Sequence, residues 1–380
     1  MIRFFISALT LLMLMACMAP QPVPEPTPEP IDALVPVAWN ELPDWQESTP
    51  AAALETFIHS CQAIGRKPEW QPACDAALWE PSGDEQRARQ FFEANFVPHR
   101  IQNEDGSVSG TITGYYAPEL AGSRVPTERF RYPLYRQPDD LLIVDLDDIY
   151  PDLKHMRLRG RLEGNRVVPY FDRAQIDNGE QPLAGNELFW VEDPVDLFFL
   201  QIQGSGRIRL PDGERVMVNY ANQNGHRYQS IGRLLLERQA MTRNQMSMQN
   251  IRRWVAENPE SGQELLEENP SYVFFRELEP GIESPLGALG ISLTAERSLA
   301  VDRRTVPLGA PVFLATNWPG SDDPLRRLMV AQDVGGAIKG RVRADFFWGM
   351  GSEAGAIAGR MKQPGRMWVL LPRDDIVAAR

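Results

Sequence analysis

The stretch Leu328–Gly351 constrains the fold more than any other part of the chain. It begins with the apolar run Leu328–Ala331, which is typical of a buried strand. The run leads through Asp333 into Gly335-Gly336, and Gly340 follows. Glycines at such positions let the backbone turn tightly or approach a ligand closely. The stretch therefore predicts a buried strand that ends in a carboxylate and a turn.

A second carboxylate in this stretch, Asp345, lies between Ala344 and the aromatic run Phe346–Trp348. Strand alternation would place it in solvent, whereas an apolar pocket would raise its pKa and keep it protonated near neutral pH. A protonated carboxyl group is what a general acid on a glycosidic oxygen requires. Aspartates beside glycines and at strand ends more often form turns and caps. The stretch by itself leaves both interpretations open.

Length and composition indicate a globular protein. The chain has 380 residues, of which 43% are hydrophobic and 24% are charged. That length allows two domains, or one domain with an insertion. The net charge of −12 argues against a general nucleic-acid binder, which would present a basic face.

Residues 1–17 predict a lipoprotein signal peptide. A single arginine precedes an apolar run from Phe4 to Ala16, which is too short to span a bilayer comfortably. The run ends in Leu-Met-Ala-Cys, which resembles a bacterial lipobox with Cys17 as the lipidated residue. A plain secretory signal with an incidental cysteine is the alternative. Because Met18, and not Asp, follows the cysteine, we expect an outer-membrane lipoprotein that faces the periplasm.

Residues 18–40 predict a linker, because proline occupies every second position from Pro20 to Pro30. Such a run is extended, semi-rigid and without a core to bury. Beyond it, Cys61 and Cys74 remain as a pair. In an exported protein they form a disulfide or stay as two buried thiols, and the sequence leaves both alternatives open.

Local patterns predict a helical start followed by a β-rich body. Helices are expected at 51–64 and 84–96, and again at 230–241, 247–257 and 353–361. Strands are expected from short apolar or β-branched runs. They are 108–116, 141–144, 167–171, 188–191, 197–202, 215–220, 273–276, 312–315, 328–331 and 367–371.

Several kinds of site are disfavoured. The four histidines, His59, His99, His155 and His226, lie far apart in no ligand spacing, and there is no C-x-x-C motif, so a zinc site is not expected. No G-x-S-x-G elbow and no P-loop occurs. We expect no metal and no cofactor.

Aromatic and amide side chains point instead to a carbohydrate. Flat faces for sugar rings are available from Tyr115, Tyr116, Trp190, Trp318 and Trp348. Planar hydrogen-bonding groups are available from Gln201, Gln203, Asn219, Asn222, Gln223 and Asn224. Singly, each is more often a core or turn residue. As a set on an exported lipoprotein, they favour a sugar polymer as substrate.

Four blocks of the chain resemble one family, the membrane-bound lytic murein transglycosylases A. They are TITGYYAPEL (111–120), DLFFLQIQGSGRI (196–208), NPSYVFFRE (269–277) and a C-terminal series. That series runs from SPLGALGISL (284–293) through VDRRTVPLGAPVFL (301–314) to AQDVGGAIKGRVRADFFWGMGSEAGAIAG (331–359). The last part also resembles the three-aspartate domain, whose aspartates here would be Asp302, Asp333 and Asp345.

The resemblance implies a mainly β fold with peripheral helices. One domain would be a double-psi β-barrel formed by residues 41–116 and 261–380. A smaller β-rich substrate-binding domain, residues 117–260, would be inserted into it, with a groove between the two.

The resemblance also implies non-hydrolytic cleavage of the β-1,4 bond between N-acetylmuramic acid and N-acetylglucosamine, by exo or endo action. Asp345 would be the general acid and then the base, with Asp333 in support. Candidate glycan contacts are Thr113, Tyr115, Tyr116, Gln201, Gln203, Gly204, Ser205 and Gly206. Expected partners are peptidoglycan strands, outer-membrane lipid and proteins of a wall-synthesis or wall-remodelling complex. A hydrolytic glycosidase and a non-catalytic peptidoglycan-binding lipoprotein are the alternatives.

Overall fold

The computed structural model describes residues 31–154, 156–178 and 181–373. The chain divides into two units, residues 1–31 and 32–380, and all the helices and strands named here lie in the second. The expected signal peptide with Cys17, and the linker up to residue 30, lie outside the described residues. Among the residues described, no helix has both the length and the apolar character needed to cross a membrane.

Three helices lie near the start of the folded unit: α1 (Ala51–Ile64), α2 (Gln71–Ala77) and α3 (Glu85–Asn95). The prediction of α1 is confirmed at both ends, and α3 begins after Asp84, whose side chain accepts a hydrogen bond from the Arg87 amide at 2.9 Å. A disulfide joins Cys61 in α1 to Cys74 in α2, which decides between the two alternatives that the sequence left open.

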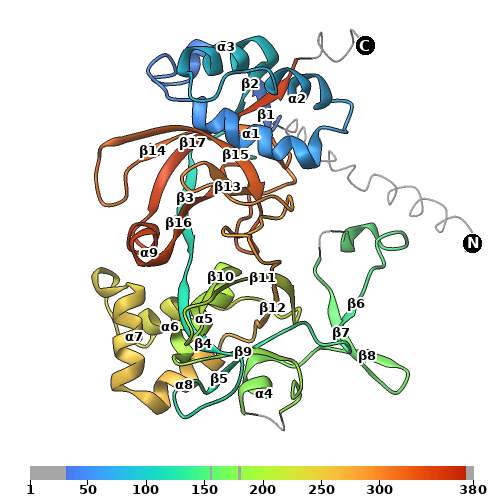
Figure 1. Ribbon diagram of the computed structural model, residues 1–380, viewed down its shortest axis with the longest axis vertical. Coiled ribbons are helices and arrows are strands. Elements are labelled where there is room, and N and C mark those ends of the chain that lie inside the picture. Colours follow the sequence, from blue (N-terminus) through green and yellow to red (C-terminus); the bar gives the residue numbers. More distant parts are fainter. Residues whose placement is uncertain (1–30, 155, 179–180, 374–380) are drawn as a thin grey trace, which may run out of the picture. The chain divides into compact units, whose positions relative to one another are not determined.

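The first sheet has eight strands in an order that mixes both ends of the chain (Figure 1). In sheet order the strands are β1 (Leu34–Pro36), β2 (Phe96–Ile101), β17 (Lys362–Pro372), β14 (Pro311–Asn317), β15 (Pro324–Asp333), β13 (Ser298–Val301), β16 (Arg343–Met350) and β3 (Gly110–Ala117). Because β17 also pairs with β3, the six strands from β17 to β3 in this order form a closed ring.

The end of the expected linker is part of this sheet. Strand β1 pairs with β2, with Val35 opposite Arg100, and a 3-10 helix, η1 (Trp39–Glu41), follows it. The prediction that residues 18–40 form a linker is therefore wrong from Leu34 onward. The short run Leu34–Pro36 carries no hydrophobic period of its own, and its strand exists because β2 offers an unpaired edge.

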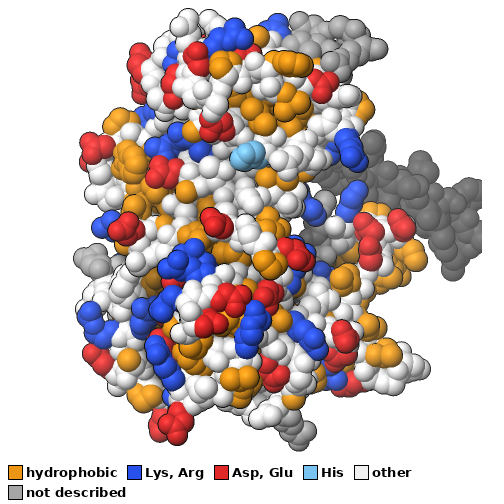
Figure 2. Space-filling model, in the orientation of Figure 1, with side chains coloured by type: hydrophobic (Ala, Val, Ile, Leu, Met, Phe, Trp, Pro, Cys, Tyr) orange, Lys and Arg blue, Asp and Glu red, His pale blue; other side chains and the backbone are white. Residues whose placement is uncertain are grey.

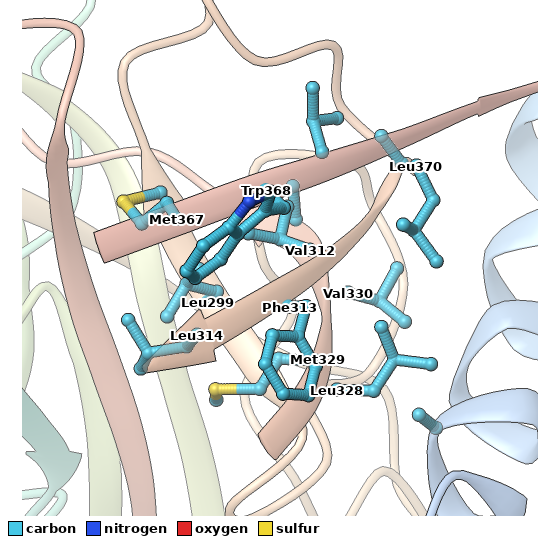
Figure 3. Packing of buried hydrophobic residues seen from close by; sticks show 14 of the residues in the cluster. Leu299, Val312, Phe313, Leu314, Leu328, Met329, Val330, Met367, Trp368 and Leu370 are labelled. Atoms are coloured by element: carbon cyan, nitrogen blue, oxygen red, sulfur yellow. The ribbon is translucent and has the colours of Figure 1, made fainter. Parts of the chain in front are cut away.

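The interior of the first sheet is a continuous apolar core. Strand β14 lies between β15 and β17, and Val312, Phe313 and Leu314 on it are fully buried. Figure 3 shows these side chains packed against Leu299, Val330 and Trp368 from neighbouring strands. Helices α1 to α3 contribute to the same core. Continuous apolar runs, and not alternating ones, are what strands covered on both faces require.

A second, six-stranded sheet is built mostly from the middle of the chain. Its strands, in sheet order, are β12 (Val273–Glu277), β11 (Arg215–Gln223), β10 (Ser205–Arg209), β4 (Glu119–Ser123), β9 (Glu187–Val191) and β5 (Tyr132–Tyr135). A three-stranded sheet accompanies it, formed by β6 (Leu142–Ile143), β7 (Arg159–Glu163) and β8 (Arg166–Val168).

The expected end of the insertion at residue 260 needs correction. Helices α7 (Met248–Glu257) and α8 (Pro259–Glu267) share one apolar cluster, and β12 then pairs with β11. The second sheet therefore includes residues up to Glu277. No sequence signal marks this return, because β12 reads like any other short apolar strand.

Other helices complete the unit: α4 (Arg173–Asn178), α5 (Pro194–Gln203), α6 (Ile231–Glu237) and α9 (Gly351–Ala358), with the 3-10 turns η2 (Pro151–Leu153) and η3 (Arg243–Gln245). The fold is thus mainly β with several helices, as expected. On the face that Figure 2 shows, acidic and basic side chains are interspersed.

The prediction of a strand at 197–202 is wrong, because these residues lie within helix α5. The Asp193 side chain accepts hydrogen bonds from the amides of Val195 and Asp196, and Pro194 occupies the first helical turn. Gly204 ends the helix with a left-handed φ of 77°. These end signals decide the conformation over the β-prone interior of the segment.

Candidate active site

Asp333 and Asp345 lie on either side of one strand of the closed ring. Ala300 in β13 pairs with Asp333 in β15 and with Asp345 in β16. Asp345 in turn pairs with Thr113 in β3. Neighbouring strands lie about 4.8 Å apart, so β13 separates the backbones of the two aspartates by about 10 Å. Four residues distant in sequence therefore form one row across the sheet.

A β-bulge in β15 brings Asp333 into this row. Leu299 pairs with Ala331, but the next residue, Ala300, pairs with Asp333, so Gln332 is the extra residue. The Gln332 side chain is fully buried and donates a hydrogen bond to Ser60 Oγ at 2.9 Å. A one-residue shift of register exchanges the two faces of a strand. The bulge thus turns Gln332 into the core and Asp333 toward the row.

The Asp345 carboxyl group is held through one of its oxygens. Thr113 Oγ1 donates a hydrogen bond to Oδ1 at 2.6 Å, and Arg343 Nη2 donates to Thr113 Oγ1 at 2.9 Å. Within the described part of the chain, Oδ2 accepts no hydrogen bond. The group is half-buried. Burial raises the pKa of Asp345, while the Thr113 hydrogen bond and the Arg343 charge oppose the rise.

The Asp333 carboxyl group is engaged through both oxygens. Its Oδ1 accepts hydrogen bonds from the backbone amides of Ala288 and Val334, each at 2.9 Å. Its Oδ2 accepts a hydrogen bond from the Tyr115 hydroxyl at 3.0 Å. Burial raises the pKa of Asp333 to about 6 against these three bonds, and the nearby Asp345 charge adds to the rise. Asp333 is therefore rigidly held and costly to ionise.

Strand alternation explains why Thr113 and Tyr115 reach the two aspartates while Tyr116 does not. Residues two apart in a strand face the same side, and Thr113 and Tyr115 bind Asp345 and Asp333, respectively. Tyr116 faces the other way, where a Cβ on Gly355 would lie only 2.7 Å from its ring. Burial and both carboxylates raise the pKa of Tyr115 well above its usual value, so its hydroxyl remains a donor.

The residues expected around Gly204 form the end of α5 and the start of β10, and the side chains of Gln201 and Gln203 accept hydrogen bonds from within the protein. Gln201 is buried and accepts a hydrogen bond from Arg173 Nη2. Gln203 Oε1 accepts a hydrogen bond from the Tyr116 amide at 3.1 Å. Ser205 is buried in β10. A Cβ on Gly206 would lie 2.5 Å from Leu200, so glycine there permits close packing.

These five residues do not contact the two aspartates directly. They are linked to them through Gln203 and β3, because Tyr116, which Gln203 binds, follows Tyr115 in the chain. Gln201 Oε1 and the Tyr116 hydroxyl have partners inside the protein, whereas Gln201 Nε2 is buried without a hydrogen-bond partner among the described residues. Direct glycan contact by these residues stays a prediction. Gln203 and Gly204 are half-buried and keep some exposed surface.

Asp302, the third aspartate of the resemblance, lies elsewhere. Asp302 is 4% exposed. Its carboxylate forms an ion pair with the Arg304 guanidinium and accepts a hydrogen bond from the Gly340 amide at 2.9 Å. These bonds hold the pKa of Asp302 well below its usual range. The group joins the turn after β13 to the loop before β16. Among the residues described, no three His, Cys, Asp or Glu side chains gather as a metal site.

Sequence reasoning missed two contributors. Arg343 lies two residues before Asp345 in the same strand, and this spacing of two is the signal that could have indicated it. The Ala288 amide, which binds Asp333, has no such signal, because the two residues are 45 positions apart and the contact uses only backbone.

The chain matches two family descriptions and several known proteins. Residues 111–276 match the MltA specific insert domain, and residues 297–371 match the 3D domain. It is 35% identical over 297 residues to the membrane-bound lytic murein transglycosylase A of Escherichia coli (strain K12), covering 76% of this chain and 72% of that protein.

Solved structures agree with this similarity. The crystal structure of MltA from Neisseria gonorrhoeae is 39% identical, with a TM-score of 0.77 over 90% of this chain and 96% of that one. The structure of E. coli MltA with bound chitohexaose is 28% identical, with a TM-score of 0.65 over 91% and 93%. The chain therefore belongs to the membrane-bound lytic murein transglycosylase A family.

Proposed function

We propose that this chain is a lytic transglycosylase. It cleaves the β-1,4 bond between N-acetylmuramic acid and N-acetylglucosamine in peptidoglycan without water and leaves 1,6-anhydro-muramyl ends. Its relatives carry the name of this activity, and one of them binds chitohexaose. One observation supports the catalytic assignment above others: a half-buried carboxyl group with a raised pKa, Asp345, has one oxygen fixed by Thr113 and the other unengaged.

In the proposed mechanism Asp345 acts twice. Protonated Asp345 gives its proton to the glycosidic oxygen that leaves with N-acetylglucosamine, and the muramyl carbon gains oxocarbenium character. The Asp345 carboxylate then takes the proton of the muramyl C6 hydroxyl. That oxygen forms a bond to the anomeric carbon and closes the anhydro ring. No water is consumed and the proton balance closes on one side chain.

The Thr113–Arg343 pair suits both halves of this cycle. A hydrogen bond from the Thr113 hydroxyl favours the carboxylate, and the Arg343 guanidinium polarises that hydroxyl further. Burial favours the neutral acid. These two influences on the Asp345 pKa oppose each other, as expected for a group that alternates between acid and base.

Asp333 is proposed as a supporting group. Its ionised form would stabilise positive charge at the muramyl carbon, and its three hydrogen bonds fix it in place. A hydrolase would instead use a second carboxylate to activate water. Both Asp333 oxygens already accept hydrogen bonds from the protein, so this carboxylate is less available for a water than that of Asp345.

We further propose that the closed ring of strands is the double-psi β-barrel expected from the resemblance. Two parallel pairs within the ring, β13 with β15 and β16 with β3, support this topology. The second sheet would form the other wall of a glycan groove, and the segment Gln203–Gly206 is its part linked most directly to the aspartates. Thr113 and Tyr115 would act on glycan through the carboxyl groups they bind.

The cellular setting is also a proposal. We expect lipid on Cys17, attachment to the outer membrane on its periplasmic side, and association with wall-synthesis or wall-remodelling proteins. Mass spectrometry of the intact N-terminal peptide from membranes would test the first expectation. An unmodified Cys17 in the mature protein would exclude a lipid anchor at that residue.

The deciding experiment is mass spectrometry of the soluble products released from purified peptidoglycan. Muropeptides lighter by one water than hydrolytic products, made by the wild-type protein and not by Asp345→Asn, would establish the proposed reaction. Reducing-end products would identify a hydrolase. Binding to peptidoglycan without any product, by folded wild-type protein, would identify a binding module.

A further inference from the structure

A cavity of 290 Å³ lies in the part of the protein built around the second sheet, and neither Asp333 nor Asp345 lines it. Its walls come from β5, β9, α4, α5 and α8. The residues that matter here are Tyr135, Arg173, Asp177, Glu187, Trp190 and Leu266. The volume is at the small end for ligand pockets, which suits an amino acid or the end of a short chain.

Arg173 carries a buried positive charge in the wall of this cavity. It is 4% exposed, and its Nε and Nη2 donate to neutral oxygens: the carbonyls of Asn269 and Ser271 and the side chain of Gln201. Nη1 takes no part in these bonds and lies 3.9 Å from the Asp177 carboxylate. A buried guanidinium is stabilised by a bidentate or close carboxylate, and within the described residues none is in hydrogen-bond contact with it.

Two carboxyl groups, those of Asp177 and Glu187, line the cavity. Burial raises the pKa of Tyr135, which also lines it, to about 12, and the charges of Glu187 and Asp177 add to the rise. Burial raises the pKa of Asp177 itself to about 6, although Arg173 opposes the rise. Asp177 lies 3.9 Å from Arg173 Nη1, and the Arg173 guanidinium also lies over the rings of Phe198 and Tyr272, 4.8 Å from each ring centre. The cavity wall carries two cations, Arg131 and Arg173, and two acids, Asp177 and Glu187, and a ligand with both charges would pair with groups of each kind.

The remaining walls are mixed, since Gln181 and Gln263 contribute amide groups beside apolar side chains. Trp190, Leu197 and Leu266 line the cavity beside the charged groups. They suit an aliphatic chain that carries the charged end. A simple sugar has neither charge, so it would supply no charged partner to Arg173, Asp177 or Glu187.

We propose that this cavity binds a free α-amino acid end, with an ammonium and a carboxylate on one carbon, at the tip of an aliphatic chain. Asp177 and Glu187 receive the ammonium group, and Arg173 Nη1 receives the carboxylate. The diamino acid of a peptidoglycan stem peptide has this chemistry, and that identification rests on the proposed function. The cavity would thus bind the stem peptide while Asp333 and Asp345 act on the glycan strand.

The cavity and the active site are joined by one helix. Gln201 in α5 accepts the Arg173 hydrogen bond, and Gln203, two residues later, accepts the bond from the Tyr116 amide in β3. A ligand in the cavity would contact Arg173, which is bonded to helix α5. The same helix is bonded to β3, the strand that carries Thr113 and Tyr115.

Calorimetric titration of the full chain tests the proposal. The probe is the tripeptide L-alanyl-γ-D-glutamyl-meso-diaminopimelate, and the comparison is the same tripeptide with L-lysine, which lacks the terminal carboxylate. We expect wild-type protein to bind the first at least tenfold more tightly than the second. Equal affinity for both, or no heat with either, would overturn the proposal. Free diaminopimelate binding as tightly as the tripeptide would support the site and make the free amino acid its ligand.

Variants locate the site. Asp177→Asn removes one carboxylate with little change of shape, and we expect at least tenfold weaker binding of the diaminopimelate tripeptide. The control is Glu260→Gln, which also replaces a carboxylate by the matching amide but at an exposed position of α8. This variant should bind the tripeptide as tightly as the wild type does. Arg173→Gln is the direct test of the cation. If it does not fold, Asp177→Asn decides, and undiminished binding by that variant would overturn the proposal.

Binding needs no cleavage, so the two proposals fail separately. Tripeptide binding without anhydro products would support the proposed binding site and contradict the proposed transglycosylase activity. Anhydro products without tripeptide binding would support the activity and contradict the binding site.

Discussion

The end of β15 and the start of β16 present the same functional group in two different environments. Among the residues that the structure describes, Asp333 accepts three hydrogen bonds through both oxygens, whereas Asp345 accepts one and its other oxygen accepts none. Both lie beside Ala300, and burial raises the pKa of both. Proximity and burial therefore do not distinguish their roles. The difference lies in which carboxyl oxygen remains available to a substrate.

The largest effect is expected for Asp345→Asn. It removes the proposed proton donor and acceptor and should lower turnover roughly 10³-fold, the scale of general acid–base catalysis. Release of soluble muropeptides, followed by chromatography, measures it. Thermal unfolding should match the wild type, as a check on folding. Retention of more than a tenth of the wild-type rate would show that the unengaged oxygen is not what distinguishes the two aspartates.

Asp333→Asn should lower turnover less, roughly 10²-fold, and should alter stability with pH. The folded pKa of about 6 exceeds the unfolded 3.8, so the folded state binds more protons between these values. Stability from this group is present below pH 3.8 and is lost as pH rises through about 6. Asparagine avoids that loss. We expect the variant to be about 1–3 kcal/mol more stable than the wild type at pH 7.5, with little difference at pH 3.5.

Urea unfolding at these two pH values measures the effect. A variant that is less stable than the wild type at pH 7.5 would show that ionised Asp333 is well compensated. Asp333 would then not be costly to ionise, and the two carboxyl groups would differ only in their hydrogen bonds.

Thr113→Val should lower the rate about tenfold through loss of one charge-assisted hydrogen bond. It should also move the alkaline limb of the kcat/KM profile to higher pH. The Thr113 hydroxyl lowers the pKa of Asp345, so its removal leaves the acid protonated over a wider range. Thr113→Ser keeps the hydroxyl and is the control. An alkaline limb that stays in place in the valine variant would mean that another group sets it.

The smallest effect on activity is expected from a change at two residues that form no hydrogen bond with either aspartate. Replacing Cys61 and Cys74 by serine opens a loop with a sequence separation of 13 and should cost about 3 kcal/mol of unfolding free energy. The rate at 25 °C should remain within twofold of the wild type, with an unchanged pH profile. A shifted profile would mean that the disulfide, and not local contacts alone, maintains the two environments.

Local signals predicted much of the fold. Helix α1 and the strands containing Val312 and Leu328 follow from runs that agree with their tertiary setting. The failure at α5 arose because the interior of the segment, Leu197–Ile202, was given more weight than its ends. Asp193-Pro194 before the segment and Gly204 after it are helix-terminus signals that the sequence does contain.

The site was less accessible to sequence reasoning, for a physical reason. Thr113 and Asp345 are 232 residues apart, and Tyr115 and Asp333 are 218 apart, so only the sheet register brings them together. The bulge at Gln332 has no pattern of its own in the sequence, although it decides which face Asp333 occupies. The resemblance named these residues; the environment of each carboxyl oxygen required the structure.

The closed ring of strands has a consequence for the order of folding. Its members come from both ends of the chain, and β17, the last strand described, pairs with β2, β3 and β14. Contacts that span hundreds of residues form late, because their loop-closure entropy is lost before any pairing compensates it. A nascent chain that lacks residues 343–372 has neither Asp345 nor the closing strand. The proposed wall-cleaving activity therefore arises only after the chain has been made as far as β17, and any C-terminal truncation that reaches Asp345 in β16 removes it.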